Sequence, residues 1–195
     1  MTKLELPDVD ASTPIEEVDA AVAQVLVPHA ERGLVQLVGD LSDFTDQEPL
    51  YAAGGAVIGT GLVLRDERTV RAGTRMLAAH LLATALRGVV KRLVVRTRPD
   101  AAARRGEYRF APGERRESEF SSFPSGHTAG AIAAARALGR HYPGSYHAWL
   151  GLAGAASVTQ VLRSKHYVTD VVAGAAIGVF AEELIDRLIR RAERI

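Results

Sequence analysis

Four uncharged apolar runs constrain the fold of this 195-residue chain more than any other feature. Residues 145–162 and 50–64 form runs of 18 and 15, and residues 76–86 and 171–181 form runs of 11 each. Ala and Gly are abundant in them, and alternation of β-branched residues is scarce, which favours closely packed helices over strands. No run clearly reaches the ~20 residues of a full membrane span. Four such runs would still leave little polar surface in a small protein, so we expect a membrane-spanning helical bundle.

Composition excludes several classes of function. The chain has no Cys, which excludes disulfides, thiolate catalysis and Cys-ligated metals. Its formal net charge of +1 argues against a nucleic-acid binder that depends on bulk electrostatics. Residues 1–13 are polar and rather acidic, and they lack the basic and then apolar pattern of a secretory signal. We expect a polar tail over residues 1–13 and a single helical domain over residues 14–195.

Breaker residues divide the chain into about six expected helices of an all-α bundle. Pro28 predicts a kink in the first helix, whose amphipathic pattern is typical of an interfacial or packing helix. The expected helices are 15–38, a helix from 50, 74–95, 126–140, 146–163 and 167–190. The expected links are a polar segment 39–49, a charged turn 65–75, a long irregular segment 96–122 and a turn 141–144.

This order of helices sorts the links into two ends of the bundle. Three basic segments share one side, which the positive-inside rule places in the cytoplasm. They are residues 65–75, the turn at Arg140, and the tail with Arg187, Arg190, Arg191 and Arg194. Segment 96–122 and the region around His166 share the other side. Segment 96–122 is itself rich in Arg, against that rule, unless its arginines have a function such as binding phosphate.

The first candidate motif runs from Lys91 to Pro99. Lys91 and Arg98 stand seven residues apart where a helix runs into a proline. A lysine offers a point charge and an arginine a planar fork, and together they suit the oxygens of a phosphate. The alternative is that these are ordinary basic residues at a helix C-terminus, where the dipole favours them.

The second motif, from Phe123 to Thr128, is a loop that turns into an Ala-rich helix. Ser125 is a suitable N-cap, and Gly126 permits tight backbone geometry. The helix start would offer unpaired N–H groups to an anion, with His127 in reach. The alternative is a common helix start that carries a surface histidine.

The third motif pairs His166 with Asp170. At positions i and i+4 the two side chains share a helix face, so the carboxylate can orient the imidazole. A neutral, oriented imidazole can accept a phosphoryl group. The alternative is a salt bridge on the helix surface.

In order, Lys-x6-Arg-Pro, Pro-Ser-Gly-His and His-x3-Asp resemble the type 2 phosphatidic acid phosphatase (PAP2) family. Its superfamily also includes bacterial class A acid phosphatases and vanadium haloperoxidases. The resemblance covers residues 91–178 and extends to the small-residue helix after Asp170. It implies a multi-pass protein of the cell (inner) membrane, with the active site at one end of the bundle and facing outward.

The resemblance also implies a mechanism without metal or cofactor. His166 would be the nucleophile, oriented by Asp170, and His127 the general acid for the leaving group. The phosphate oxygens of a lipid substrate would be bound by residues from all three motifs. These are Lys91, Arg98, Ser125 and Gly126.

One position departs from the family pattern. Gln160 stands where the family carries an arginine six residues before the nucleophile, so one anion clamp is missing. Arg163 lies three residues later on nearly the same helix face, and whether it compensates stays open. If it does, Arg163→Ala would impair the enzyme much more than Gln160→Ala.

Several basic residues have simpler interpretations. We interpret Arg92, Arg96 and Arg104 as structural or membrane-facing, and we expect no metal site among the remaining histidines. Those histidines are His29, His80, His141 and His147.

Two alternative functions stay open. One is a soluble acid phosphatase or a vanadate-dependent haloperoxidase. The other is a membrane scaffold that keeps the fold but has lost turnover through Gln160.

Overall fold

The computed structural model describes residues 6–7, 13–114 and 117–194. Their α-helices are α1 (Pro14–Leu26), α2 (Gly33–Ser42), α3 (Gln47–Leu64), α4 (Glu67–Leu93), α5 (Pro99–Arg105), α6 (Gly126–His141), α7 (Tyr146–Leu162) and α8 (Val168–Ala192). Strands β1 (Val94–Arg96) and β2 (Phe110–Pro112) pair antiparallel. Short 3₁₀ turns are η1 (Val27–His29), η2 (Asp43–Thr45), η3 (Ser118–Phe120) and η4 (Pro143–Ser145). The expected all-α helical bundle is therefore confirmed.

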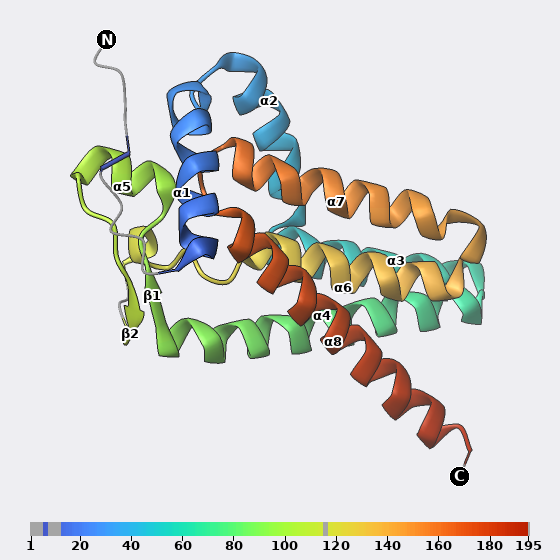
Figure 1. The fold of residues 1–195 in the computed structure, drawn as a ribbon. Coiled ribbons are helices and arrows are strands. Elements are labelled where there is room, and N and C mark those ends of the chain that lie inside the picture. Colours follow the sequence, from blue (N-terminus) through green and yellow to red (C-terminus); the bar gives the residue numbers. More distant parts are fainter. Residues whose placement is uncertain (1–5, 8–12, 115–116, 195) are drawn as a thin grey trace.

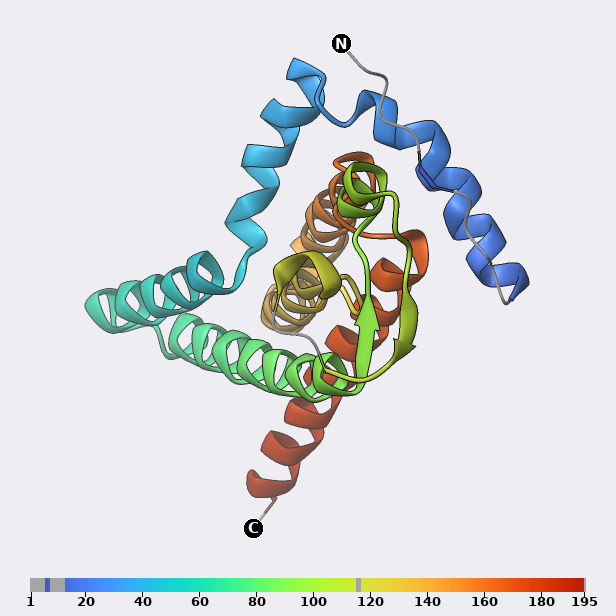
Figure 2. The ribbon, with the colours of Figure 1, turned by 90° about the vertical axis from the view of Figure 1, so that its left-hand side faces the viewer.

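Helix α6 is the central element of the bundle. It packs against α4, α7 and α8, and α3 lies along α4 (Figures 1 and 2). Its buried face is built of alanines, including Ala129, Ala133 and Ala137. Glycines of α8 allow this close packing, since a Cβ at Gly178 would lie 2.5 Å from the Ala129 carbonyl oxygen. Small side chains thus let the backbones approach until they touch.

The predicted helix boundaries hold best in the second half of the chain. Helices α6, α7 and α8 occupy the expected ranges, each beginning after a turn. The first expected helix is divided at Pro28 by η1, where the proline breaks the helical pattern. The expected irregular segment 96–122 contains α5, β2 and η3. Its Pro99 stands at the first position of α5, where a proline fits a helix start.

The predicted charged turn 65–75 is wrong. The turn is confined to Arg65, in the left-handed region at φ 53°, and Asp66, which accepts a hydrogen bond from the Arg68 N–H as the N-cap of α4. Helix α4 begins at Glu67, whose carboxylate suits the positive end of the helix dipole. Arg68 and Arg71 are exposed on the first turns of this continuous helix, whereas Arg75 is partly buried and paired with Asp186.

The predicted sorting of the links into two ends is confirmed. Segments 96–112 and 118–125, helix α1 and the His166 loop gather at one end, where Figure 1 shows α1, α5 and the two strands. The α3–α4 turn, the end of α6 and the end of α8 meet at the other, around a cavity described below. In the part of the chain that the structure describes, no helix combines the length and the apolarity needed to cross a membrane. The division into a tail 1–13 and one domain 14–195 stays a prediction, and residues 1–5 and 8–12 lie outside the described residues.

Candidate active site

The three sequence motifs meet at one end of the bundle, which faces the viewer in Figure 2. The loop of residues 121–125 joins them. The Lys91 ammonium donates hydrogen bonds to the Ser121 carbonyl and hydroxyl oxygens at 3.0 and 2.8 Å. The His166 imidazole contacts the next carbonyl, that of Ser122. Helix α4, the loop and the start of α8 thus hold their side chains against one another.

His166 is held in one tautomer. Its Nδ1 lies 2.7 Å from the Ser122 carbonyl oxygen, and since a carbonyl only accepts, Nδ1 carries the proton. In the neutral ring Nε2 then keeps its lone pair. Burial lowers the pKa of His166 to about 4, helped by the nearby charges of Arg98 and Lys91 and opposed by Asp170. The ring is therefore neutral at neutral pH, with Nε2 available as a nucleophile.

Asp170 supports the site more than it contacts the imidazole. Its carboxylate accepts hydrogen bonds from the Ser122 hydroxyl at 2.5 Å and the Tyr167 N–H at 2.8 Å, and it lies 3.7 Å from His166 Nδ1. Burial acts to raise the pKa of Asp170, but contacts with His166, Arg96 and Ser122 outweigh it and hold the pKa below its usual value. Asp170 thus contacts the Ser122 loop more closely than it contacts the imidazole.

Arg96 is the buried structural partner of that carboxylate, not a membrane-facing cation. It donates to Asp170 at 2.7 Å and to Asp19 of α1 at 2.8 Å. Its guanidinium lies 4.1 Å from the centre of the Tyr167 ring and 4.6 Å from that of Phe110. Both carboxylates are buried with it, so the group forms a closed ionic hub behind the site.

Lys91 and Arg98 have backbone or hydroxyl partners and no acidic one within the described residues. The Arg98 Nε–H donates to the Ser118 carbonyl at 2.9 Å, and Lys91 donates to Ser121. Among the described residues, neither forms an ion pair with a carboxylate within 4.0 Å. Burial and, to a smaller extent, the charges of Arg87 and Arg98 lower the pKa of Lys91 to about 7. Such uncompensated cations fit a site that binds an anion.

Arg87 is a member of this cluster that the sequence motifs do not include. It lies on α4 one helical turn before Lys91, and the start of α6 approaches its guanidinium so closely that a Cβ at Gly126 would lie 2.7 Å from the guanidinium carbon. Its spacing of i, i+4 from Lys91 is a signal that could have indicated it. The contact with Gly126 is tertiary and has no sequence signature.

The start of α6 has the predicted cap. Ser125 is buried, its hydroxyl oxygen accepts from the Thr128 N–H at 3.5 Å, and its own N–H donates to the Asp170 carbonyl at 2.9 Å. His127 Nε2 lies 3.8 Å from Asp46 and 3.9 Å from Asp43, two carboxylates at η2. Burial lowers the pKa of His127, and these two carboxylates oppose that effect.

The two residues discussed as the missing clamp have other partners. The Gln160 side chain is buried and donates to the Ser42 hydroxyl of α2 at 3.0 Å. Arg163 donates to the Gly39 carbonyl at 3.0 Å and to Asp43 at 2.6 Å. Whether Arg163 also binds phosphate stays a prediction, but its guanidinium is already paired with a carboxylate.

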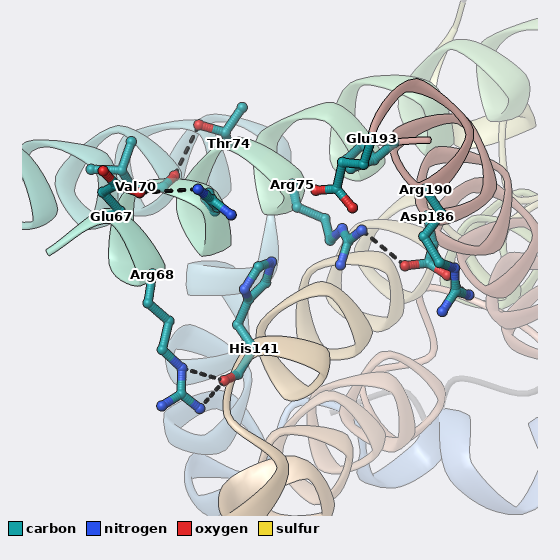
Figure 3. A pocket seen from close by; sticks show the side chains of 11 residues that line it. Glu67, Arg68, Val70, Thr74, Arg75, His141, Asp186, Arg190 and Glu193 are labelled. Carbon is teal, nitrogen blue, oxygen red and sulfur yellow. Dashed lines mark hydrogen bonds and ion pairs between the residues drawn. The ribbon is translucent and has the colours of Figure 1, made fainter. Parts of the chain in front are cut away.

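A cavity at the opposite end of the bundle gives a useful contrast. It encloses about 670 Å³ between α4, the end of α6 and the end of α8. Its cations have partners, as Figure 3 shows for Arg75, which lies 2.9 Å from Asp186, and for Arg68, which donates to the His141 carbonyl at 2.8 Å. At the motif end, by contrast, Lys91 and Arg98 have no carboxylate partner among the described residues. No group of three His, Cys, Asp or Glu side chains suited to a metal ion is found within those residues either.

Curated relatives match about half of this chain. A lipid A 1-phosphatase of Rhizobium johnstonii is 40% identical over 97 residues, which are 49% of this chain and 38% of that protein. A lipid A 1-phosphatase of Porphyromonas gingivalis is 33% identical over 84 residues, which are 40% of this chain and 19% of that protein. The chain thus aligns with less than two fifths of each of these relatives.

A solved structure shares the fold. It is a transmembrane PAP2-type phosphatidylglycerolphosphate phosphatase from Bacillus subtilis, with a TM-score of 0.65 and 20% identity, covering 92% of this chain and 89% of that one. The sequence pattern of the PAP2 superfamily matches residues 72–192, which hold all three motifs and more than half of the chain. This protein therefore belongs to the PAP2 superfamily.

Proposed function

We propose that this protein is a phosphatase that hydrolyses a phosphomonoester or diphosphate of a lipid through a phosphohistidine intermediate. The observation that carries the proposal is the juxtaposition of His166, whose Nε2 is unprotonated, with Lys91 and Arg98, whose charges lack carboxylate partners among the described residues. A phosphate dianion would neutralise these cations and place its phosphorus before the imidazole. The lipid A 1-phosphatase relatives support this class of reaction.

In the proposed first step, His166 Nε2 attacks phosphorus and the bond from phosphorus to the ester oxygen breaks. Lys91 and Arg98 hold the equatorial oxygens, and the N–H groups at the start of α6 add the positive end of a helix dipole. His127 gives its proton to the departing alkoxide, so the alcohol leaves neutral. Burial lowers the pKa of His127 overall, and the charges of Asp46 and Asp43 act against that effect, toward the protonated form that this step requires.

In the second step, water attacks the phosphohistidine. His127, now neutral, takes a proton from the water as the new oxygen–phosphorus bond forms and the nitrogen–phosphorus bond breaks. Inorganic phosphate leaves, and His166 returns to its neutral tautomer on the Ser122 carbonyl. Asp170 keeps the Ser122 loop in place through both steps.

A lipid substrate also agrees with the surface of the bundle. Large apolar side chains are exposed on the outer faces of several helices, with Val63 of α3 at 82% exposure and Val172 of α8 at 62%. Exposed apolar area of this extent is typical of a membrane or protein interaction surface. We propose that the protein works at the cell membrane with the site facing outward; the multi-pass topology stays a prediction of the sequence.

The proposal is tested by phosphate release from purified full-length protein. The substrates are phosphatidate, a prenyl diphosphate, a lipid A-type phosphate and a soluble aryl phosphate, each with and without chelator and vanadate. We expect release from at least one lipid, insensitive to chelator and inhibited by vanadate, and its loss in His166→Ala at unchanged melting temperature. His147→Ala, an exposed histidine at the other end, is the matched control.

Three results would contradict the proposal. Turnover by folded His166→Ala would exclude this nucleophile. Release only from the soluble ester would favour a soluble-type acid phosphatase. Bromide oxidation with vanadate and peroxide, or folded protein that hydrolyses none of the substrates, would favour the haloperoxidase or the scaffold.

A further inference from the structure

Arg87 is a partly buried cation that none of the described residues neutralises. Its Nε–H is shielded from solvent and has no hydrogen-bond partner, and among the described residues its guanidinium forms no ion pair. The carboxylate that acts on it most strongly is Asp46, which is half exposed and beyond ion-pair distance. Arginines elsewhere in the bundle, such as Arg136 and Arg140 on Glu182, are paired.

The surroundings of Arg87 are positive. The guanidinium lies against Gly126 at the N-terminus of α6, which is the positive end of a 16-residue helix. The charge of Arg98 lowers the pKa of Arg87, and the charges of Arg87 and Arg98 lower the pKa of Lys91. Holding three partly buried like charges near a helix N-terminus is unfavourable unless an anion binds between them.

Gly126 has a specific consequence for Arg87. A Cβ at this position would overlap the guanidinium, so the missing side chain is what lets Arg87 reach the start of α6. The overlapping atoms belong to the flexible end of a side chain, and Arg87 could swing away without a shift of the backbone. Gly126 therefore controls the position of Arg87 more than the stability of the fold.

The site lacks one phosphate-binding arginine that the family pattern expects, and Arg87 is placed to replace it. The family pattern expects an arginine at position 160, where this chain has Gln160, whose amide is committed to Ser42. Arg163, which could replace it, already donates to the Asp43 carboxylate and the Gly39 carbonyl. Arg87 has no ion pair among the described residues, and it lies beside both Lys91 and the start of α6.

We propose that Arg87 binds the oxygens of the phosphoryl group and supplies the anion clamp that Gln160 cannot. Its effect on turnover rests on the proposed phosphatase function, whereas its effect on anion binding does not. A planar fork that donates two hydrogen bonds is suited to oxygens that gain charge in the transition state.

The test compares Arg87→Ala and Arg87→Lys with Arg92→Ala, an exposed arginine on the same helix. For Arg87→Ala we expect kcat/KM to fall about 100-fold or more, as for a lost transition-state donor. The Kd for orthovanadate should rise at least about tenfold, with Arg87→Lys in between because it keeps the charge but loses the fork. Arg92→Ala should leave both quantities and the melting temperature unchanged.

Gly126→Ala provides the second arm. It should lower vanadate affinity in the wild-type background and have little further effect in Arg87→Ala, because both changes remove the same interaction. Folded Arg87→Ala that binds vanadate like wild type, or fully additive effects of the two changes, would overturn the inference.

The two proposals fail separately. His166→Ala removes the nucleophile but leaves the cations, so its binding of inorganic phosphate by calorimetry isolates the clamp. If wild type releases no phosphate but binds phosphate in a manner that depends on Arg87, the proposed phosphatase function is wrong and the anion-binding role of Arg87 is supported. If turnover is normal and Arg87→Ala changes neither turnover nor binding, the anion-binding role of Arg87 is wrong and the proposed phosphatase function is supported.

Discussion

At the scale of single residues, Lys91 is the group whose protonation state should respond most to a ligand. Burial and the charges of Arg87 and Arg98 bring its pKa to about 7, well below its ordinary value of 10.5. In the empty site at pH 8 most of the Lys91 amine is therefore neutral. A bound dianion stabilises the ammonium form and raises the pKa, so binding and proton uptake are linked.

We predict that binding of sulfate, a dianion that does not titrate near neutral pH, takes up close to one proton at pH 8 and fewer at pH 6. The uptake is measured by calorimetry in buffers of different ionisation enthalpy. Lys91→Arg, which keeps a cation that does not titrate, should bind sulfate without the uptake. Lys165→Met, a lysine paired with Asp100, should behave as wild type; unchanged uptake in Lys91→Arg would assign it to another group.

At the scale of elements, the contact of α8 with the start of α6 sets the geometry of the site. A Cβ at Gly174 would lie 2.5 Å from the Ser125 carbonyl oxygen and 3.2 Å from the Thr128 Cβ. The nearer of these atoms is backbone, so it cannot move without displacing the loop that carries Ser125. The same close approach permits the hydrogen bond from the Ser125 N–H to the Asp170 carbonyl.

Gly174→Ala should therefore destabilise the protein by about 1–3 kcal/mol, the usual range for overpacking, and lower activity with it. The matched control is Gly154→Ala on α7, where a Cβ meets nothing within 4 Å. That change should raise stability by up to about 1 kcal/mol through helix propensity. Chemical denaturation of both variants measures the difference, and equal effects would show that α8 does not constrain α6 at this point.

The sequence predicted some elements better than others for physical reasons. Helices α6–α8 carry their own start signals, such as the Ser125 cap, so local chemistry was sufficient. The turn before α4 was predicted too long because a dense charge pattern is typical both of a turn and of an exposed helix. The position of Arg87 beside Gly126 depends on how α4 crosses α6, which no local pattern contains.

The sequence predicted which residues gather at this end of the bundle, but not the hydrogen bonds between them. The sequence motifs named both histidines and two of the cations that gather at this end of the bundle, and family spacing supplied their order. The i, i+4 pairing suggested a direct contact of His166 with Asp170, whereas the nearest partner of the imidazole is the Ser122 carbonyl. A hydrogen bond to the backbone carbonyl of a distant loop, such as that of Ser122, has no sequence signature.

At the scale of the whole molecule, apolar faces and the cation cluster together suggest how a lipid is presented. Exposed apolar side chains occur along α3, α4, α7 and α8, including Leu62, Leu81, Val158 and Phe180. The candidate site lies at one end of these helices. A lipid whose tail follows the apolar faces would bring its phosphate to that end.

We predict that the protein floats with phospholipid vesicles in a density gradient and requires detergent for extraction. Introducing charge on the exposed apolar face, as in Val63→Glu with Val172→Glu, should reduce flotation because a charged side chain in the bilayer costs about 2–4 kcal/mol. Val172→Leu alone is the matched control. Phosphate release from a soluble ester should persist in the charged variant, and protein that stays in the aqueous phase from the start would contradict the prediction.

The buried ion pairs of Arg96 determine the smallest segment that could carry this site into a chimeric protein. Asp19 in α1 is one of its two buried carboxylate partners, yet α1 lies outside the residues 72–192 that the family pattern matches. A chimera that carried only the matched segment would import Arg96 with half of its counter-charge missing, and a buried cation left that way is strongly unfavourable. A functional transplant should therefore need α1, with Asp19 facing Arg96, in addition to residues 72–192.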